Sequence, residues 1–381
     1  MNSNREMGLF GEPLKKSIYV HAILAITVIF AVQLFSFLYA QEPQYGGLNY
    51  PSDIKRVKER GKLVVAQYQG SRALFFMPLP KTGELPEAAV LKSPDGTMTG
   101  GIDIAIAKFV AKRLDVELEL KRDYKTFNDV VTAVANGEAD LGISKLELTF
   151  SRAQSCSFSK PYANFSTAIV ASRSFMASKG LSKETQLSEE KLKEVFDNDG
   201  ITIGVIDGNS KQELRAMLLP KTKEKLFKNY DDALAAVRDG KVAATIIDDF
   251  DYMFISSINQ ELKTYCVMLK LQDRRAKIAA AVRPDSTNLL RLVNEVVDYI
   301  GQEDAESMMR KYGRTLKRIE QDIVASGAKV IPGSDYAFLA RAKERNSGFA
   351  LSDAIASVGT AIPMILFGML WFSLSKRKVR K

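Results

Sequence analysis

The sequence predicts an α/β protein built from two similar lobes. Two segments, 127–143 and 230–246, share one pattern at a fixed separation of 103 positions. Each begins with an aromatic residue, continues as a short amphipathic helix ended by glycine, and closes with an apolar run typical of a buried strand. Ligands of open α/β sheets bind beyond the carboxyl ends of strands. We therefore expect the residues after these strands, Ser144–Lys145 and Ile247–Asp248, to face one cleft.

Alternating helix and strand patterns occupy the chain from residue 52 to residue 300. A Ser or Asp residue is expected to cap the first helix, which ends at Gly61. Asp95–Gly96 predicts a hairpin turn within 93–99, and the charged stretch 178–199 is typical of a surface excursion. We expect helices at 52–61, 102–114, 211–219, 250–258 and 288–300, and strands at 62–67, 116–122, 166–171, 201–206 and 277–282.

Composition and charge indicate an ordinary globular protein. The chain has 381 residues, 46% hydrophobic and 26% charged, which allows two or three domains. The formal charge of +9 is concentrated at the C-terminus, where the segment 376–381 contains five basic residues. Because no basic stripe interleaved with aromatic residues remains, the sequence predicts no nucleic-acid partner.

Few residues could support histidine- or cysteine-based chemistry. The single histidine, His21, lies in an apolar stretch, which argues against the common histidine triads and histidine-rich metal sites. Cys156 and Cys266 are too few and too far apart for a zinc site, and whether they form a disulfide stays open. We expect no cofactor and no bound metal.

Both ends of the chain carry a long uncharged stretch. Residues 18–40 could cross a bilayer as an anchor, with 1–17 in the cytoplasm, although a cleavable signal peptide is the alternative. Residues 354–374 predict a second membrane helix, because the basic tail 375–381 follows at once. Both ends then lie inside, and residues 41–350 lie outside the cytoplasmic membrane.

Four motifs, in their order along the chain, resemble the family 3 solute-binding proteins. They are G-G-I-D-I-A-I-A-K-F-V-A-K-R-L at 100–114, the run 142–162 ending in S-R-A-Q-S-C-S-F-S-K-P-Y, the turn I-G-V-I-D-G-N-S, and the return A-A-A-V-R-P-D-S. Members are periplasmic amino-acid receptors of ABC transporters with a type 2 periplasmic-binding-protein fold. The resemblance covers 53–318. It implies lobe 1 at 53–163 and 277–318, lobe 2 at 167–273, crossings near 163–166 and 274–277, and a charged extension at 319–350.

The resemblance also implies a ligand site. An amino acid carries a carboxylate and an ammonium group, so its receptor needs a cation and an anion facing one cleft. By likeness to the family, Arg152 would bind the carboxylate, together with Asn209 and Ser210 in the turn of lobe 2, and Asp248 would bind the ammonium group. The alternatives are a surface arginine and an aspartate that caps the next helix. The aromatic residues expected along the lobe 1 wall, with core packing as their alternative role, are Tyr68, Phe76 and Phe127.

The chain departs from the family where the first repeat ends. The usual pattern is Ser-Gly-x-Thr-x-Thr, whereas this chain has Ser144, Lys145, Glu147 and Thr149 at these ligand-binding positions. A lysine in a partly closed cleft is unfavourable unless it is paired. Either Lys145 and Glu147 neutralise each other and fill the pocket, or they recognise a ligand unlike a standard α-amino acid. Asp103 is present, but Ala105 replaces the family's second acidic residue.

Three functions remain open at this stage, because a fold alone does not determine function. The first is a membrane-tethered receptor, not an enzyme, that closes on an amino acid or similar small polar ligand for an ABC transporter. The second is a ligand-free adaptor in a membrane protein complex. The third is an enzyme on the same scaffold, similar to cyclohexadienyl dehydratase, in which Glu147 or Lys145 would act as the acid. The ligand, the permease and the oligomeric state stay open.

Overall fold

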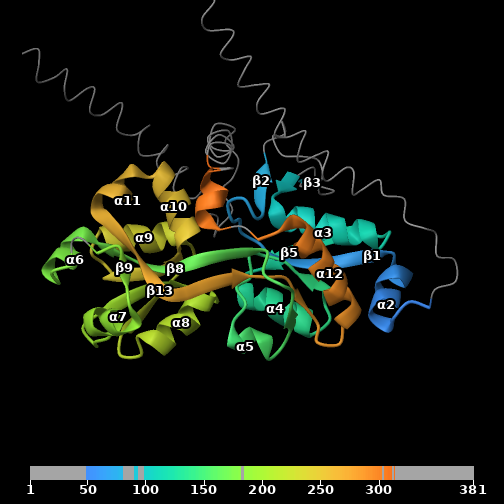
Figure 1. Ribbon diagram of the computed structural model, residues 1–381, viewed down its shortest axis with the longest axis horizontal. Coiled ribbons are helices and arrows are strands. Elements are labelled where there is room, and N and C mark those ends of the chain that lie inside the picture. The colour runs from blue at the N-terminus through green and yellow to red at the C-terminus, as the bar shows by residue number, and fades with distance from the viewer. Residues whose placement is uncertain are drawn as a thin grey trace, which may run out of the picture.

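The computed structural model describes residues 49–79, 90–92, 98–181, 184–302, 304–310 and 313. These residues form two α/β lobes that lie side by side, joined by long strands (Figure 1). The predicted two-lobed α/β fold is confirmed.

Lobe 1 is centred on a five-stranded sheet of order β5-β1-β6-β14-β7. A small sheet of order β2-β4-β3 lies beside it, and the antiparallel β3 and β4 flank the expected hairpin turn. The strands are β1 (Lys62–Tyr68), β2 (Met77–Leu79), β3 (Val90–Lys92), β4 (Met98–Gly100), β5 (Glu117–Tyr124), β6 (Leu141–Gly142), β7 (Ser157–Phe158) and β14 (Ala281–Val282). The helices are α2 (Ser52–Arg60), α3 (Ile102–Arg113), α4 (Phe127–Ala135), α5 (Phe150–Ala153) and α12 (Thr287–Ile300).

Lobe 2 is centred on a six-stranded sheet of order β11-β10-β12-β8-β13-β9. Its strands are β8 (Ala163–Ser172), β9 (Gln186–Leu187), β10 (Thr202–Ile206), β11 (Lys223–Phe227), β12 (Ala244–Asp248) and β13 (Cys266–Ile278). Its helices are α6 (Arg173–Ser178), α7 (Glu189–Phe196), α8 (Ser210–Leu218), α9 (Tyr230–Arg238), α10 (Asp249–Ile258) and α11 (Gln260–Tyr265).

The sequence repeat corresponds to a structural repeat. Helices α4 and α9 have nine residues each and start 103 positions apart. The side chains of Thr126 and Asn229 cap them by accepting a hydrogen bond from the third helical residue. The sheet orders also agree, because β5-β1-β6-β14 in lobe 1 has the same parallel and antiparallel pairing as β11-β10-β12-β8 in lobe 2. Strands β6 and β12 are therefore equivalent.

Two antiparallel strands connect the lobes. Residues Ala163–Ser166 of β8 pair with Arg275–Ile278 of β13, and a register shift follows between Lys270 and Arg275. We assign both chain crossings to this paired segment, where the resemblance places them. Figure 1 shows the two strands running from one lobe into the other.

Three local predictions need correction. The first helix has Pro51 at its N-cap without a side-chain cap, since Asp53 instead accepts hydrogen bonds from the backbone N–H groups of Asn288 and Leu289 at the start of α12. The stretch 178–199 is not only a surface excursion, because α7 buries one apolar face in the lobe 2 core. The expected strand 277–282 is divided between the end of β13 and β14.

Several sequence predictions fall outside the described residues. These are the hairpin turn and the terminal segments 1–17, 18–40, 319–350, 354–374 and 375–381. Among the helices that the structure describes, none has both the length and the apolar character required to cross a bilayer. Cys156 and Cys266 lie within the described part, where both are buried free thiols and form no disulfide.

Candidate functional site

A lysine and an aspartate from equivalent strand ends meet between the two lobes. Lys145 follows β6 and Asp248 ends β12, and the two positions are 103 residues apart, as the repeat requires. Lys145 Nζ lies 3.0 Å from Asp248 Oδ2 and 2.7 Å from Oδ2 of Asp251 on α10. All three residues are at most 8% exposed. The expectation that these strand ends face one another is confirmed.

The backbone at Lys145 has an unusual conformation. Its φ of 47° lies in the left-handed region, which disfavours a residue with a Cβ atom by about 1–2 kcal/mol. The Lys145 N–H donates to Asp103 Oδ2 at 2.7 Å, which anchors the turn. The ammonium group lies 5.6 Å and 5.2 Å from the ring centroids of Phe75 and Phe165. The cation therefore sits between carboxylates and aromatic rings.

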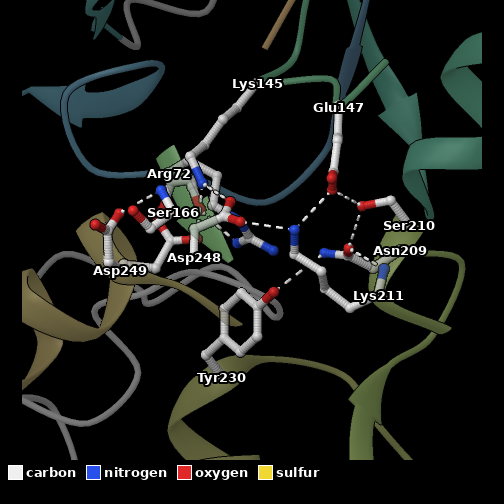
Figure 2. A network of polar contacts seen from close by, with 12 residues as sticks. Arg72, Lys145, Glu147, Ser166, Asn209, Ser210, Lys211, Tyr230, Asp248 and Asp249 are labelled. Carbon is white, nitrogen blue, oxygen red and sulfur yellow. Dashed lines mark hydrogen bonds and ion pairs between the residues drawn. The ribbon is translucent and has the colours of Figure 1, made fainter. Parts of the chain in front are cut away.

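Glu147 extends the ionic contacts to a second lysine (Figure 2). Its carboxylate accepts a short hydrogen bond from Ser210 Oγ and lies 2.8 Å from Lys211 Nζ. Lys211 Nζ also lies 2.7 Å from Asp248 Oδ1. The charges thus alternate from Asp251 through Lys145, Asp248 and Lys211 to Glu147. We call these five residues the cleft ion network.

Local backbone structure positions Glu147 and its partners. Residues 146–148 run beside the end of β13, because Ala279 N–H donates to Leu146 O and Leu148 N–H donates to Lys277 O. On the opposite side, the Asn209 side chain caps α8 by accepting from Lys211 N–H at 3.0 Å. A helix N-terminus favours an anion, so the first turn of α8 is a suitable place for the Glu147 carboxylate.

The ion pairs dominate the electrostatics of these buried groups. Burial alone would raise the pKa of Asp248, but Lys211 and Lys145 lower it to about 2. Burial likewise opposes the charged form of both lysines, whereas their carboxylate partners raise the pKa of Lys145 and of Lys211 above the ordinary range. Lys145, Lys211 and Asp248 are therefore all charged at neutral pH.

Arg152, on α5, is held by groups of the chain itself. The guanidinium is buried, and burial lowers its pKa to about 10. Its Nε and Nη2 atoms donate to Asn128 Oδ1 at 3.2 and 2.9 Å, and Nη1 donates to Glu147 O at 3.0 Å. Nη2 also lies 3.4 Å from Gly208 O in lobe 2. The alternative of a solvated surface arginine is wrong, and Thr149 caps α5 by accepting from Arg152 N–H.

An aromatic group surrounds a second buried arginine. The rings of Tyr68 and Phe127 stack with centroids 4.7 Å apart. The guanidinium carbon of Arg72 lies 5.3 Å from Tyr68, 5.0 Å from Phe127 and 5.9 Å from Tyr230 of lobe 2. Phe127 and Tyr230 are equivalent in the repeat, so both lobes contribute to this cage.

The remaining predicted site residues have varied positions. Ser144 is buried and its Oγ accepts from Tyr68 N–H at 3.0 Å, so it fixes the strand end. Phe76 is fully buried with its ring 5.8 Å from the Arg122 guanidinium, and its neighbour Phe75 contacts Lys145 instead. For Phe76, core packing is the observed role.

Two further alternatives from the sequence are corrected by these contacts. Lys145 and Glu147 do not neutralise each other, because each pairs with residues of lobe 2. Asp248 occupies the N-cap position of α10 but makes no side-chain cap. Asp249 points the other way, since its carboxylate accepts a hydrogen bond from Ser166 N–H (Figure 2) and pairs with Lys270.

Sequence reasoning missed four residues of the site. Asp251 lies in the first turn of α10, three residues after the N-cap residue Asp248, a spacing that places both on one side of the helix start. Lys211 lies in the first turn of α8, where a cation is unfavourable, and this unusual placement could have been noticed in the sequence. Arg72 and Phe75 belong to an irregular loop, and no sequence pattern marks them as site residues. Within the described part, no group of three or more His, Cys, Asp and Glu side chains could hold a metal ion.

Comparison with known proteins gives a consistent set of matches. A sequence model of the bacterial extracellular solute-binding proteins, family 3, matches residues 86–315, which is more than half of the chain. The glutamine-binding protein of Geobacillus stearothermophilus is 25% identical over 199 residues, covering 51% of this chain and 64% of the relative. The membrane-bound lytic murein transglycosylase F of Idiomarina loihiensis is 29% identical over 153 residues, covering 39% of this chain and 30% of the relative.

The chain thus spans less than two thirds of the length of either of these curated relatives. Among solved structures, a similar one is an amino-acid ABC transporter substrate-binding protein from Streptococcus pneumoniae bound to L-arginine. It is 21% identical, with a TM-score of 0.49 and coverage of 72% of this chain and 99% of that chain.

Proposed function

Because this chain belongs to the bacterial extracellular solute-binding proteins of family 3, we propose that it is a membrane-tethered receptor for a small polar ligand. The ligand carries an ammonium or guanidinium group and a carboxylate, as an amino acid does. The receptor domain lies outside the cytoplasmic membrane and serves an ABC permease. The glutamine-binding relative supports the ligand class.

One observation carries this proposal. In lobe 2, the carboxylates of Asp248 and Asp251 hold the ammonium group of Lys145, while Ser210 and Lys211 at the start of α8 hold the carboxylate of Glu147. A cleft of this kind presents separate places for a positive and a negative group, one beside the other. Closure of two lobes around such a ligand is a hinge motion stabilised by bonds to both sides.

Lys145, one of the two acids considered for an enzyme, is poorly suited to proton donation. An efficient general acid has a pKa near the working pH, whereas the carboxylate partners of Lys145 raise its pKa above the ordinary range. Burial raises the pKa of Asp103 to about 7, but this carboxylate is fully buried and bonds Tyr162 OH and Lys145 N–H. Its role is structural. We therefore propose a binding protein, although a transglycosylase is among the relatives.

A second candidate is a ligand-free adaptor in a membrane protein complex. The observation that favours it is the pairing of cleft charges across the lobes, which joins them through the chain's own side chains. Under this alternative the closed domain itself is the binding surface for a protein partner.

Calorimetric titration of the full-length chain with an amino-acid panel tests the receptor proposal. We expect saturable binding of at least one cationic or amide amino acid that Asp248→Asn abolishes. Asp298→Asn, which removes a surface carboxylate paired with Lys160, is the matched control and should bind as the wild type does. Binding that survives Asp248→Asn would contradict a ligand site in this cleft, and release of a chemically altered ligand would contradict a binding role.

A further inference from the structure

We infer that Lys145 and Glu147 are tethered substitutes for the ligand. They occupy the places of an amino acid's ammonium and carboxylate groups, hold the two lobes together without solute, and set the specificity of the cleft against free amino acids. The inference rests on the proposed function for the class of ligand. Its structural part, closure by the chain's own side chains, rests on the contacts of the cleft ion network.

The ammonium group of Lys145 is chemically the same as that of an amino acid. It lies within 3.0 Å of carboxylate oxygens of Asp248 and Asp251 and near the rings of Phe75 and Phe165. Its side chain is 4% exposed. A second cation brought to these carboxylates would lie beside a buried like charge, which is strongly unfavourable. A free amino acid can therefore bind here only after Lys145 leaves.

The carboxylate of Glu147 occupies the anion seat of lobe 2. It accepts from Ser210 Oγ, pairs with Lys211, and lies at the first turn of the nine-residue α8. These are the groups that a ligand carboxylate would use. The side chain reaches them from lobe 1, so this contact joins α8 to the end of the first repeat.

The guanidinium of Arg152 is engaged in the same way. Its donors face Asn128 Oδ1 and the carbonyl oxygens of Glu147 and Gly208. The guanidinium that would bind a ligand carboxylate therefore already has hydrogen-bond partners in lobe 1 and contacts the lobe 2 turn. Each charged group expected to meet a zwitterion meets a group of the chain instead.

Backbone strain adds an independent reason to assign a role to Lys145. Only glycine adopts a φ of 47° without strain, yet the chain places a lysine there. A glycine at this position would also remove the ammonium group from Asp248. The strained lysine persists because its contacts with Asp248, Asp251 and the Asp103 carboxylate fix it.

A distance measurement between the lobes tests the closure. Spin labels are attached to Phe150→Cys on α5 and Met217→Cys on α8, which are 82% and 55% exposed, while both native cysteines are buried. We expect the full-length chain without ligand to give a short, narrow distance distribution. In the variant Lys145→Gly/Glu147→Thr the distribution should become longer and broader. A long distribution in the parent, or no change in the variant, would overturn the inference.

A matched control keeps the net charge change equal. Lys55→Ala/Glu59→Ala removes an exposed lysine and glutamate paired along α2 and should leave the distance unchanged. If the double variant in the cleft does not fold, Glu147→Gln tests the carboxylate alone. This substitution preserves size and removes the charge at Ser210 and Lys211.

Titration with L-glutamine and L-arginine separates failure of this inference from failure of the proposed function. We expect Lys145→Gly/Glu147→Thr to bind one of them at least about tenfold more tightly than the wild type, since a binding-competent state is no longer suppressed. Equal affinity in both proteins overturns the inference and leaves the receptor function standing. Absence of binding in both, with the lobes shown to open in the variant, rejects the amino-acid ligand but supports the closure.

Discussion

Replacing Lys145 by two different residues separates ionic from backbone effects on stability. Lys145→Ala leaves Asp251 without its cation and Asp248 with Lys211 alone, and breaking a buried pair in this way costs about 3–5 kcal/mol. Lys145→Gly removes the same ammonium but also relieves left-handed strain of about 1–2 kcal/mol. The greater freedom of glycine in the unfolded chain offsets about 0.5–1 kcal/mol of this relief. We expect the glycine variant to be the more stable by roughly 0.5–1 kcal/mol.

Urea unfolding of the full-length chain at pH 7 measures both differences. The control is Lys55→Ala, which removes an exposed lysine paired with Glu59 and should change the free energy of unfolding by at most about 0.5 kcal/mol. A loss below about 1 kcal/mol in Lys145→Ala would show that the buried pairs contribute little net stability, contrary to our reasoning. A glycine variant no more stable than the alanine variant would refute the argument from backbone strain.

Three further outcomes are expected. The shift of the pKa of Asp248 from 3.8 to about 2, which its two lysine partners produce against the effect of burial, corresponds to about 2 kcal/mol of stability. This stability is present above pH 4 and is lost as the pH falls toward 2. Acid unfolding followed by circular dichroism should therefore show a smaller loss of stability between pH 4 and pH 2 in Asp248→Asn than in the wild type. Arg72→Met should lower the free energy of unfolding by about 1–2 kcal/mol in urea, because a guanidinium among three aromatic rings is lost; an unchanged value would show that the cage contributes nothing. Thiol titration of the denatured protein should find Cys156 and Cys266 both reactive with and without prior reduction, and a deficit without reductant would contradict the free thiols of the structure.

The repeat made the architecture and the centre of the site predictable. Local helix and strand patterns located the elements because each buries one face against a sheet. The fixed offset then related Lys145 to Asp248 before any contact was known, and the structure confirms that they meet. The motif order gave the family, which the match over residues 86–315 confirms.

The partners of the charged groups were harder to predict. Lys145 and Glu147 lie two residues apart, yet the backbone conformation after β6 directs their side chains to different groups of lobe 2. Their separation along the sequence does not indicate these side-chain directions. Asp251 and Lys211 became identifiable once α10 and α8 were placed at the interface. The use of Arg152 as a bridge to Asn128 depends on side-chain packing that no local pattern encodes.

Opposite charge at matching positions has a consequence for how such a domain could arise. In a symmetric pair of identical half-proteins, a residue on the axis meets its own copy, so two lysines or two aspartates would repel each other there. Within one polypeptide the two equivalent positions are independent of each other, and in this chain position 145 is a lysine and position 248 an aspartate. Joining the halves in a single chain is what permits the two halves to attract one another at their shared centre.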